Sequence, residues 1–508
     1  MARASLSRAL PPRPTTADAL AALNVALILI PQSLAYATIA GVPPVYGLYA
    51  AVAAPIAGAI VGSSPYLQTG PVAVTSLLTF GALAPLAEPS TVEFATLAAV
   101  LALIVGIVRV ALGLVRAGPI AFLMSQPVIV SFTTAAAVLI IGTQVAALLG
   151  TRTEVGNPLL GVVDVLRRPD DWRLDSLVIG VVAGAVLVVG RRISSFFPGA
   201  LIAVLGTTAY AAVAGYDGAT VGEVELGWMP PTGIDGASLL GLVVPGVIIA
   251  VIGFAEPASI ARKYAAQDRQ RWNANREFVG QGLANIASGA AGGFPVGGSF
   301  SRTALNRLAG ARSRWSGALT GLVVLAILPF IGLVRDLPTA ALSGLVIAAV
   351  MGLIDWRSPM RYWGWSKPQF AVGTVTAVAT LVLAPRVDLG VIVGVGAALV
   401  VHLWRETRVQ VPLEVVGDTL HVHPAGILYF VSAPMVEARL DDAVADNREV
   451  DRVVVHLDRV GRLDVSGVLV LQTLVERARD SDCAVTFAGG TPQQRQLIGR
   501  VLGDGVLA

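Results

Sequence analysis

The chain has 508 residues, of which 55% are hydrophobic and only 14% are charged, and its mean hydropathy is +0.73. Soluble globular proteins carry about 25% charged residues, so a chain this long and apolar cannot cover itself with polar surface in water, and much of it must face lipid. The small net charge of +3 argues against a nucleic-acid binder, and the single cysteine, Cys483, excludes a disulfide framework and a thiolate metal cluster.

Long runs of alanine, valine, leucine, isoleucine and glycine fill the chain up to a change in composition near Trp404–Val411. Only helices satisfy their own backbone in lipid without closing a barrel, so this part is predicted to be a bundle of membrane helices. Arg3, Arg8 and Arg13 lead into an apolar stretch that is too long, and too interrupted by Pro31, for a cleavable signal peptide. The candidate spans are Ala17–Ile39, Val45–Val61, Val92–Leu114, Ile120–Leu149, Leu174–Gly190, Pro198–Ala214, Leu239–Ala255, Ala318–Val334, Ala340–Ile354 and Gln369–Ala384.

Two further segments, Pro71–Ala84 and Ser299–Leu308, have helical character but are too short to cross a hydrocarbon core about 30 Å thick. Each follows a short strand-like stretch, YLQTG before the first and GFPVGG before the second. Interrupted segments that occur in both halves of a transporter point to its binding site. Unpaired amides and the helix dipole make a helix N-terminus equivalent to about half a positive charge, so both starts are suited to an anion.

The residues at the two breaks fit this interpretation. Proline at a first helical position loses no hydrogen bond, and Gly70, Gly297 and Gly298 allow backbone segments to approach closely. A single break of this kind would be read as an ordinary Gly/Pro interruption of a membrane helix. Two breaks in corresponding places favour a site.

Arg302 lies in the first turn of the second short segment, among Ser299, Ser301 and Thr303. A charge at membrane depth costs about 2.5–3.5 kcal/mol on insertion scales, so it persists only where it is paired or wetted. The functional interpretation is a fixed positive charge that raises anion occupancy. The alternative is that Arg302 snorkels to the cytoplasm or forms a structural pair.

Two more polar residues fall inside apolar helices. Glu256 could exchange protons, bind a cation or neutralise Arg302, or it could cap a helix break made by Pro257. Gln32 follows Pro31 in the first helix, and Tyr36 lies one turn later on the same face. A polar contact between helices is the alternative to a binding role for these two.

Arginine placement predicts the topology. Arg109, Arg116 and later arginine pairs fall at alternate helix ends, while Asp217, Glu223, Glu225 and Asp235 mark opposite ends. This positive-inside pattern puts both termini in the cytoplasm and requires an even number of spans, for which fourteen elements are expected.

The tail, about Val411–Ala508, alternates strands and helices and is predicted to be a small α/β domain. Its strand-like stretches are TLHVHP, ILYFVS, RVVVHLDRV and CAVTFAG, and its helix-like stretches are Ala433–Ala445, Ser466–Asp480 and Pro492–Leu502. His421 and His423 alternate on a strand and could share a ligand, although exposed strand residues are the simpler interpretation. The expected division is a membrane domain, 1–408, and a soluble domain, 409–508.

Taken together, these stretches closely resemble the SulP family of anion transporters, called solute carrier family 26 in animals. The motifs that show this resemblance are IPQSLAYATIAGVPPVYGLYAA, TGPVAVTSLL and the run NREFVGQGLANIASGAAGGFPVGGSFSRTALNRLAGARSRWSG. The tail resembles the STAS domain of that family, with RLDVSG where anti-sigma-factor antagonists have a phosphorylatable loop. The resemblance covers essentially the whole chain.

The resemblance implies fourteen transmembrane segments as seven-plus-seven inverted repeats, a core domain that moves as an elevator against a gate domain, and a homodimer. By position, Gln32 and Tyr36 would line the anion site, and Glu256 would approach it from the eighth helix. The two helix ends would come from Gly70, Pro71, Val72 and Ala73 and from Ser299, Phe300, Ser301 and Arg302. Many members thought to be proton-coupled carry glutamate where this chain has Thr38, which puts proton coupling there in doubt. Ser466 is either a phosphate acceptor or a plain N-cap serine.

The sequence therefore predicts a secondary transporter for small anions such as bicarbonate, sulfate, chloride or a dicarboxylate like fumarate, coupled to H⁺, Na⁺ or a counter-anion. It is placed in the bacterial inner membrane, without cofactor, metal or nucleic acid. A passive anion channel, a membrane scaffold for the STAS domain and a nucleobase transporter of the same fold are the alternatives. No catalytic triad, metal cluster or nucleotide loop supports an enzyme.

Overall fold

A computed structural model of the chain describes residues 13–122, 125–194, 197–222, 236–406, 411–429, 432–447, 449–480 and 483–507. The chain divides into two compact units, Met1–Ala397 and Ala398–Ala508. The expected boundary between residues 408 and 409 lies outside the described residues, as do Glu223, Glu225 and Asp235.

The first unit is helical apart from two very short strands. Eight of its described helices are long and apolar enough to cross a membrane, which confirms the predicted polytopic membrane domain. Its elements are α2 (Thr16–Ala40), α3 (Pro44–Val61), β1 (Thr69–Gly70), α4 (Ala73–Leu83), α5 (Val92–Leu114), α6 (Gln126–Leu148), α7 (Pro158–Leu166), α8 (Leu174–Ile193), α9 (Gly199–Ala214), α10 (Gly236–Gln267), α11 (Ala274–Ala290), β2 (Gly297–Gly298), α12 (Phe300–Leu308), α13 (Trp315–Ile327), α14 (Thr339–Val350), α15 (Arg357–Trp365), α16 (Lys367–Val382) and α17 (Val387–Glu406), which runs across the division.

The order of these elements repeats. With the short helices α7 and α15 set aside, α2 to α9 and α10 to α17 form two sets of seven, and β1–α4 and β2–α12 each take third place. The strands pair antiparallel, Thr69 with Gly298 and Gly70 with Gly297. Antiparallel pairing of corresponding elements is what two repeats of opposite orientation require.

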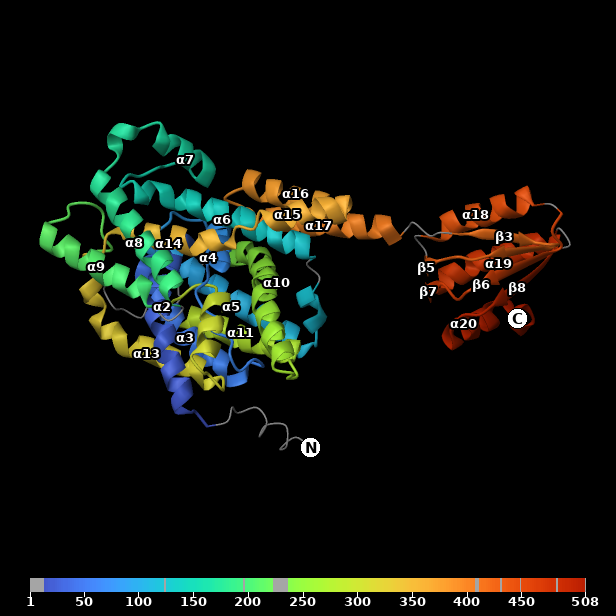
Figure 1. The fold of residues 1–508 in the computed structure, drawn as a ribbon, viewed down its shortest axis with the longest axis horizontal. Coiled ribbons are helices and arrows are strands. Elements are labelled where there is room, and N and C mark those ends of the chain that lie inside the picture. Colours follow the sequence, from blue (N-terminus) through green and yellow to red (C-terminus); the bar gives the residue numbers. More distant parts are fainter. Residues whose placement is uncertain are drawn as a thin grey trace. The chain divides into compact units, whose positions relative to one another are not determined.

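The helices pack into two groups. The first helix group consists of α2, α3, α4, α5, α10, α11, α12 and α13, which contact one another, and the second helix group of α6, α8, α9, α14 and α16. Figure 1 shows α3, α5 and α11 close together in the first unit, with α9 on the other side, next to α2. Helices α2 and α4 join the groups, because α2 also contacts α9 and α14, and α4 contacts α6.

Several predicted boundaries were wrong. Helix α6 begins at Gln126 rather than Ile120, after a 3-10 turn over Gly118–Phe122. Helix α10 continues through Pro257 to Gln267, so Pro257 does not end it. Neighbouring helices support such a proline in membrane bundles, and the backbone of Gly298 lies against Pro257 here. Helices α11 and α17 were not named from the sequence.

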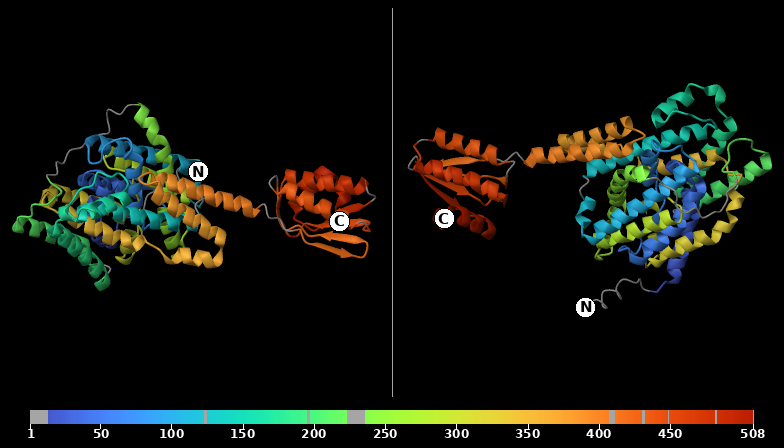
Figure 2. Two further views of the ribbon diagram at one scale, coloured as in Figure 1. Left: turned by 90° about the horizontal axis from the view of Figure 1, so that it is seen from above. Right: turned by 180° about the vertical axis from the view of Figure 1, so that it is seen from behind.

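The second unit is the predicted small α/β domain. Its sheet has the order β3-β4-β6-β8, from Leu413–Val416, Thr419–Val422, Arg452–His456 and Ala484–Ala488, while β5 (Gly426–Leu428) pairs with β7 (Val460–Leu463). Helices α18 (Ala433–Asp446), α19 (Val465–Asp480) and α20 (Pro492–Leu502) complete the domain. Figure 2 shows helices lying along one side of the strands. The core joins Val422, Val455 and Phe487 to Val468 and Ile498.

The opposite face of this sheet carries a histidine cluster, defined as His421, His423 and His456. Nδ1 of His421 lies 2.9 Å from Nε2 of His456, and the rings of His423 and His456 stack with centroids 4.3 Å apart. All three are half-buried, so the interpretation as simple exposed strand residues was wrong. The described residues hold no group of His, Cys, Asp or Glu side chains arranged to bind a metal ion.

Candidate functional site

Strands β1 and β2 bring the starts of the two short helices together. Beyond the strand pairing, the backbone N–H of Ser299 donates to the carbonyl of Gln68 at 3.0 Å, and the N–H of Gln68 donates to Oγ1 of Thr303 at 3.1 Å. A Cβ at position 298 would lie only 2.7 Å from Cδ1 of Leu67. Glycine at Gly298 therefore permits the close approach on which the arrangement depends.

Helix α4 presents an N-terminus that no side chain caps. Its first residue is Ala73, and its N-cap is Val72, which is extended and has no side-chain acceptor to offer. The first amides of a helix have no partner within the helix. The expectation that Pro71 opens the helix was wrong, because Pro71 precedes the N-cap and contributes its carbonyl to the site instead.

The start of helix α12 is partly satisfied by its own surroundings. Oγ of the N-cap Ser299 accepts a hydrogen bond from the backbone N–H of Arg302 at 3.4 Å. The Glu256 carboxylate lies near the backbone N–H of Phe300. Oγ of Ser301 lies 3.3 Å from Oγ of Ser299. The two helix starts thus differ, since α12 already faces a carboxylate and α4 does not.

Arg302 joins three parts of the first helix group. Its Nη1 donates to Oε1 of Gln32 at 3.1 Å, and its Nη2 donates to the carbonyl of Pro71 at 2.8 Å. With 1% of its surface exposed, Arg302 does not snorkel to the cytoplasm, so that alternative was wrong. The guanidinium holds helix α2, the start of α4 and helix α12 in one arrangement.

A cavity of about 410 Å³ lies over these helix starts. Of the predicted site residues, it is lined by Gln32, Tyr36, Val72, Ala73, Glu256, Ser299, Phe300 and Ser301. Gly70, Pro71 and Arg302 are not part of its lining. They shape the cavity from behind, since Gly70 pairs with β2 and Arg302 holds Gln32 and Pro71.

Sequence reasoning missed part of this lining. Lys263 and Tyr264 contribute from α10, Val350 contributes from the last residue of α14, and Gly352 and Leu353 contribute from the 3-10 turn that follows it. Lys263 follows Glu256 by seven residues, two turns along the same helix, and would have been found had α10 been continued past Pro257. No comparable signal marks the residues at the end of α14.

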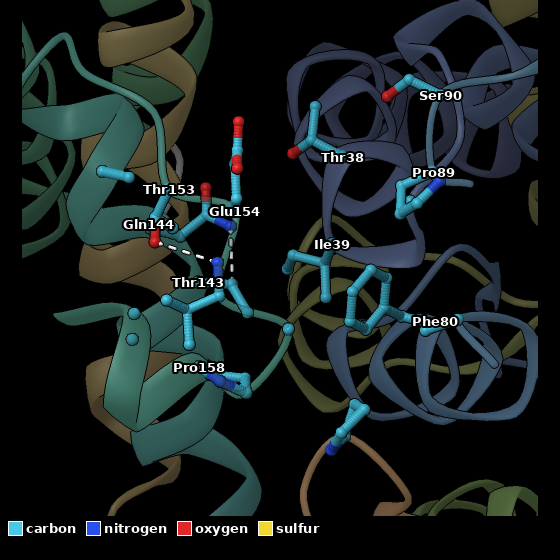
Figure 3. Close-up of a pocket in the computed structure, with 18 of the residues that line it drawn as sticks. Thr38, Ile39, Phe80, Pro89, Ser90, Thr143, Gln144, Thr153, Glu154 and Pro158 are labelled. Atoms are coloured by element: carbon cyan, nitrogen blue, oxygen red, sulfur yellow. Dashed lines mark hydrogen bonds between the residues drawn. The ribbon is translucent and has the colours of Figure 1, made fainter. Parts of the chain in front are cut away.

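A second cavity, of about 760 Å³, lies beside the C-terminal end of α2 (Figure 3). Thr38, Phe80 and Ser90 face it from the first helix group, and Gln144 and Glu154 face it from the opposite wall. Tyr36 lines the first cavity and Thr38 lines this one, so the two spaces flank α2 only a short distance apart along it. Oγ1 of Thr38 donates to the carbonyl of Ala35 at 2.7 Å.

Ser466 lies in the first turn of α19 and is half-buried. Oδ1 of Asp464 accepts the backbone N–H of Gly467 at 2.9 Å, and the carbonyl of Asp464 accepts the N–H of Val468. Asp464 therefore caps this helix, and the interpretation of Ser466 as the N-cap was wrong. Phosphorylation of Ser466 stays a prediction.

Comparison with known proteins gives consistent matches along the chain. The profile of the sulfate permease family matches residues 16–376, and that of the STAS domain matches residues 410–501. The chain is 35% identical to the probable sulfate transporter MT1781 of Mycobacterium tuberculosis over 87% of this chain and 77% of that protein. It is 30% identical to the chloroplastic sulfate transporter 4.1 of Arabidopsis thaliana over 93% of this chain and 74% of that protein.

The fold has a close structural counterpart. The murine solute carrier 26 family member A9 anion transporter, solved in the inward-facing state, superimposes with a TM-score of 0.88, covering 97% of this chain and 89% of that one at 19% identity. This likeness extends over both the membrane unit and the STAS domain.

Proposed function

We propose that this chain, which belongs to the sulfate permease family, is a secondary transporter that moves a small inorganic or carboxylate anion through the cavity over α4 and α12. The family consists of membrane anion transporters, so anion transport itself is the premise. The proposal adds the site, the class of substrate and the manner of transport. This class includes sulfate, bicarbonate, chloride and small dicarboxylates such as fumarate.

One observation carries the proposal: the β1–β2 pair aims two helix N-termini at one cavity, and the guanidinium of Arg302 lies directly behind it. The uncapped amides of α4 supply hydrogen bonds and about half a positive charge without a bulky side chain. Arg302 adds a full charge that is held in place by Gln32 and Pro71. A helix-end site of this kind selects for negative charge and small size.

Glu256 is proposed as the coupling residue. Its carboxylate lines the cavity and lies near the N–H of Phe300, so it occupies the anion-attracting end of α12. A proton or a sodium ion on this carboxylate would remove its repulsion of the substrate. Lys263, farther along α10 in the lining of the same cavity, would attract the anion into it.

The manner of transport proposed is an elevator, in which the first helix group acts as the core domain and the second as the gate domain. Support comes from the packing, because contacts are dense within each group and few helices join them. It also comes from the two cavities that flank α2. Assembly as a homodimer in the bacterial inner membrane, with cytoplasmic termini and 409–508 as a cytoplasmic domain, belongs to the same proposal.

Counterflow in proteoliposomes tests this function. Vesicles loaded with one anion should accumulate labelled anion from outside in a saturable manner, and the rate should rise with anion on the far side. Separate variation of pH and sodium identifies the coupling ion. A flux that never saturates and shows no trans-stimulation would indicate a passive channel, and absence of both flux and anion binding would leave the membrane unit as a scaffold.

A further inference from the structure

Arg109 is a second arginine in the interior of the first helix group, and it does not line the cavity. It lies five residues before the end of α5 and has 0% of its surface exposed. Its side chain lies inside the helix group, and the expectation that it marks a cytoplasmic helix end stays a prediction. Within the described ranges, no carboxylate forms an ion pair with it.

The guanidinium of Arg109 is held by backbone carbonyls. Nε donates to Ala250 at 3.0 Å and Nη2 to Ile249 at 3.3 Å, both in α10, and Nη1 donates to Val296 at 3.0 Å. Val296 directly precedes Gly297, the first residue of β2. Arg109 thus fixes the approach to the strand that carries α12.

The same guanidinium lies near the start of α4. A Cβ at Gly253 of α10 would lie 2.6 Å from Nη2 of Arg109 and 3.0 Å from Cγ2 of Thr75, in the first turn of α4. A Cβ at Gly297 would lie 3.6 Å from the same Cγ2 atom. Arg109 therefore lies behind the start of α4 and behind the strand that leads into α12, on the side away from the cavity.

A neutral side chain can also donate to the carbonyl of Val296, as Asn285 demonstrates. Its side chain accepts from the N–H of Val296 at 2.9 Å and donates to the carbonyl of Val296 at 3.1 Å. A buried cation with only carbonyls for partners is expensive, because a desolvated charge normally demands an opposite charge. Beyond Asn285, Arg109 adds the two hydrogen bonds to α10 and a positive charge that no described carboxylate compensates.

We infer that Arg109 is a positioning residue for transport whose buried charge is balanced by the substrate anion itself. The inference rests on the proposed function and deepens it, because it assigns the cavity a positive potential with two sources. Arg302 already has Glu256 near it, whereas Arg109 has no described acid. The site is then more positive than Arg302 and Glu256 alone would make it, which favours an anion over neutral molecules of the same size.

The test compares Arg109→Gln, Arg109→Lys and Asn285→Ala with the unmodified full chain in proteoliposomes, by KM and maximal rate for the best anion found. Arg109→Gln keeps a hydrogen-bond donor and loses the charge, so its KM should rise about tenfold. Arg109→Lys restores the charge and should keep KM within about twofold of the unmodified protein. Asn285→Ala removes the other support of Val296 and keeps the charge, so it should lower the maximal rate or the yield and leave KM in place.

Two results would overturn the inference: an unchanged KM in Arg109→Gln, or equal rises in KM for the glutamine and lysine variants. If the glutamine variant does not fold, the lysine variant decides, because a tenfold rise in its KM would assign Arg109 to backbone support alone. Failure of the unmodified protein to show saturable flux would instead refute the proposed function, so the two failures are distinguishable.

Discussion

Replacing Arg302 by glutamine should weaken anion binding far more than it weakens the fold. The side chain has two hydrogen bonds, to Gln32 and to the carbonyl of Pro71, and 1% of its surface is exposed. Glutamine can keep part of this hydrogen bonding, so the loss of folding stability should be about 1–3 kcal/mol. The charge is lost completely.

The effect on binding follows from Coulomb's law. At a separation of about 8 Å and an effective dielectric constant of about 20, a unit charge contributes about 2 kcal/mol to the binding of a monovalent anion. Since about 1.4 kcal/mol is a factor of ten, KM should rise about 30-fold. A divalent anion should lose about twice that free energy, so the ratio of the two effects also reports substrate charge.

The assay is initial uptake into proteoliposomes, with the melting temperature of each purified variant as a measure of folding. Arg302→Lys keeps the charge and should retain most of the affinity. Arg307→Gln is the matched control, because Arg307 is on the same helix, pairs with Asp268 and lies outside the lining of the cavity. An unchanged KM in Arg302→Gln, with uptake falling only in proportion to folded protein, would refute the reasoning and assign Arg302 to structure.

Four further predictions concern other parts of the chain. Val72→Asp should raise KM at least 100-fold, because a carboxylate at the N-cap would occupy the free amides of α4, whereas Val72→Ala should be nearly neutral. Glu256→Gln should change the dependence of uptake on pH or sodium, and uptake with an unaltered ion dependence would remove the coupling role. Burial, followed by the neighbouring His423 and His421, lowers the pKa of His456 below its ordinary value of 6.5, so the unfolded form binds protons more readily. The stability of the STAS domain is therefore complete above pH 6.5 and should fall on acidification, measured as the opening free energy of β4 and β6 by amide hydrogen exchange; His456→Asn should flatten this dependence. Deleting Val411–Ala508 should lower rate or yield and leave anion binding intact, and a folded truncation that no longer binds anion would contradict this division of roles.

Much of the fold could be predicted because membrane spans and alternating strands leave strong patterns in sequence. The third segments could also be predicted, since Gly70 and Gly297–Gly298 mark the places where backbone must approach backbone. What escaped prediction depends on tertiary contacts. Pro257 is a helix breaker by local rules, yet α10 continues through it because neighbouring elements pack around the proline.

The candidate site divides in the same way. Ser299, Ser301, Glu256 and Gln32 could be found because polar residues within apolar segments demand an explanation. Arg109 is also a polar residue between apolar neighbours, but its position near the end of α5 suggested only a role in membrane topology. Only the folded chain shows that its partners are carbonyls from α10 and from the residue before β2.

The central claim is that one anion sits between the uncapped start of α4 and the start of α12. The most direct measurement is a cryo-electron microscopy difference map of the full chain with and without a saturating electron-rich anion such as selenate. Density within hydrogen-bonding reach of the backbone amides of Ala73 and Val74, and lost in Val72→Asp, is the predicted result. Bound selenate located elsewhere, with the cavity between the two helix starts holding no difference density, would contradict the account.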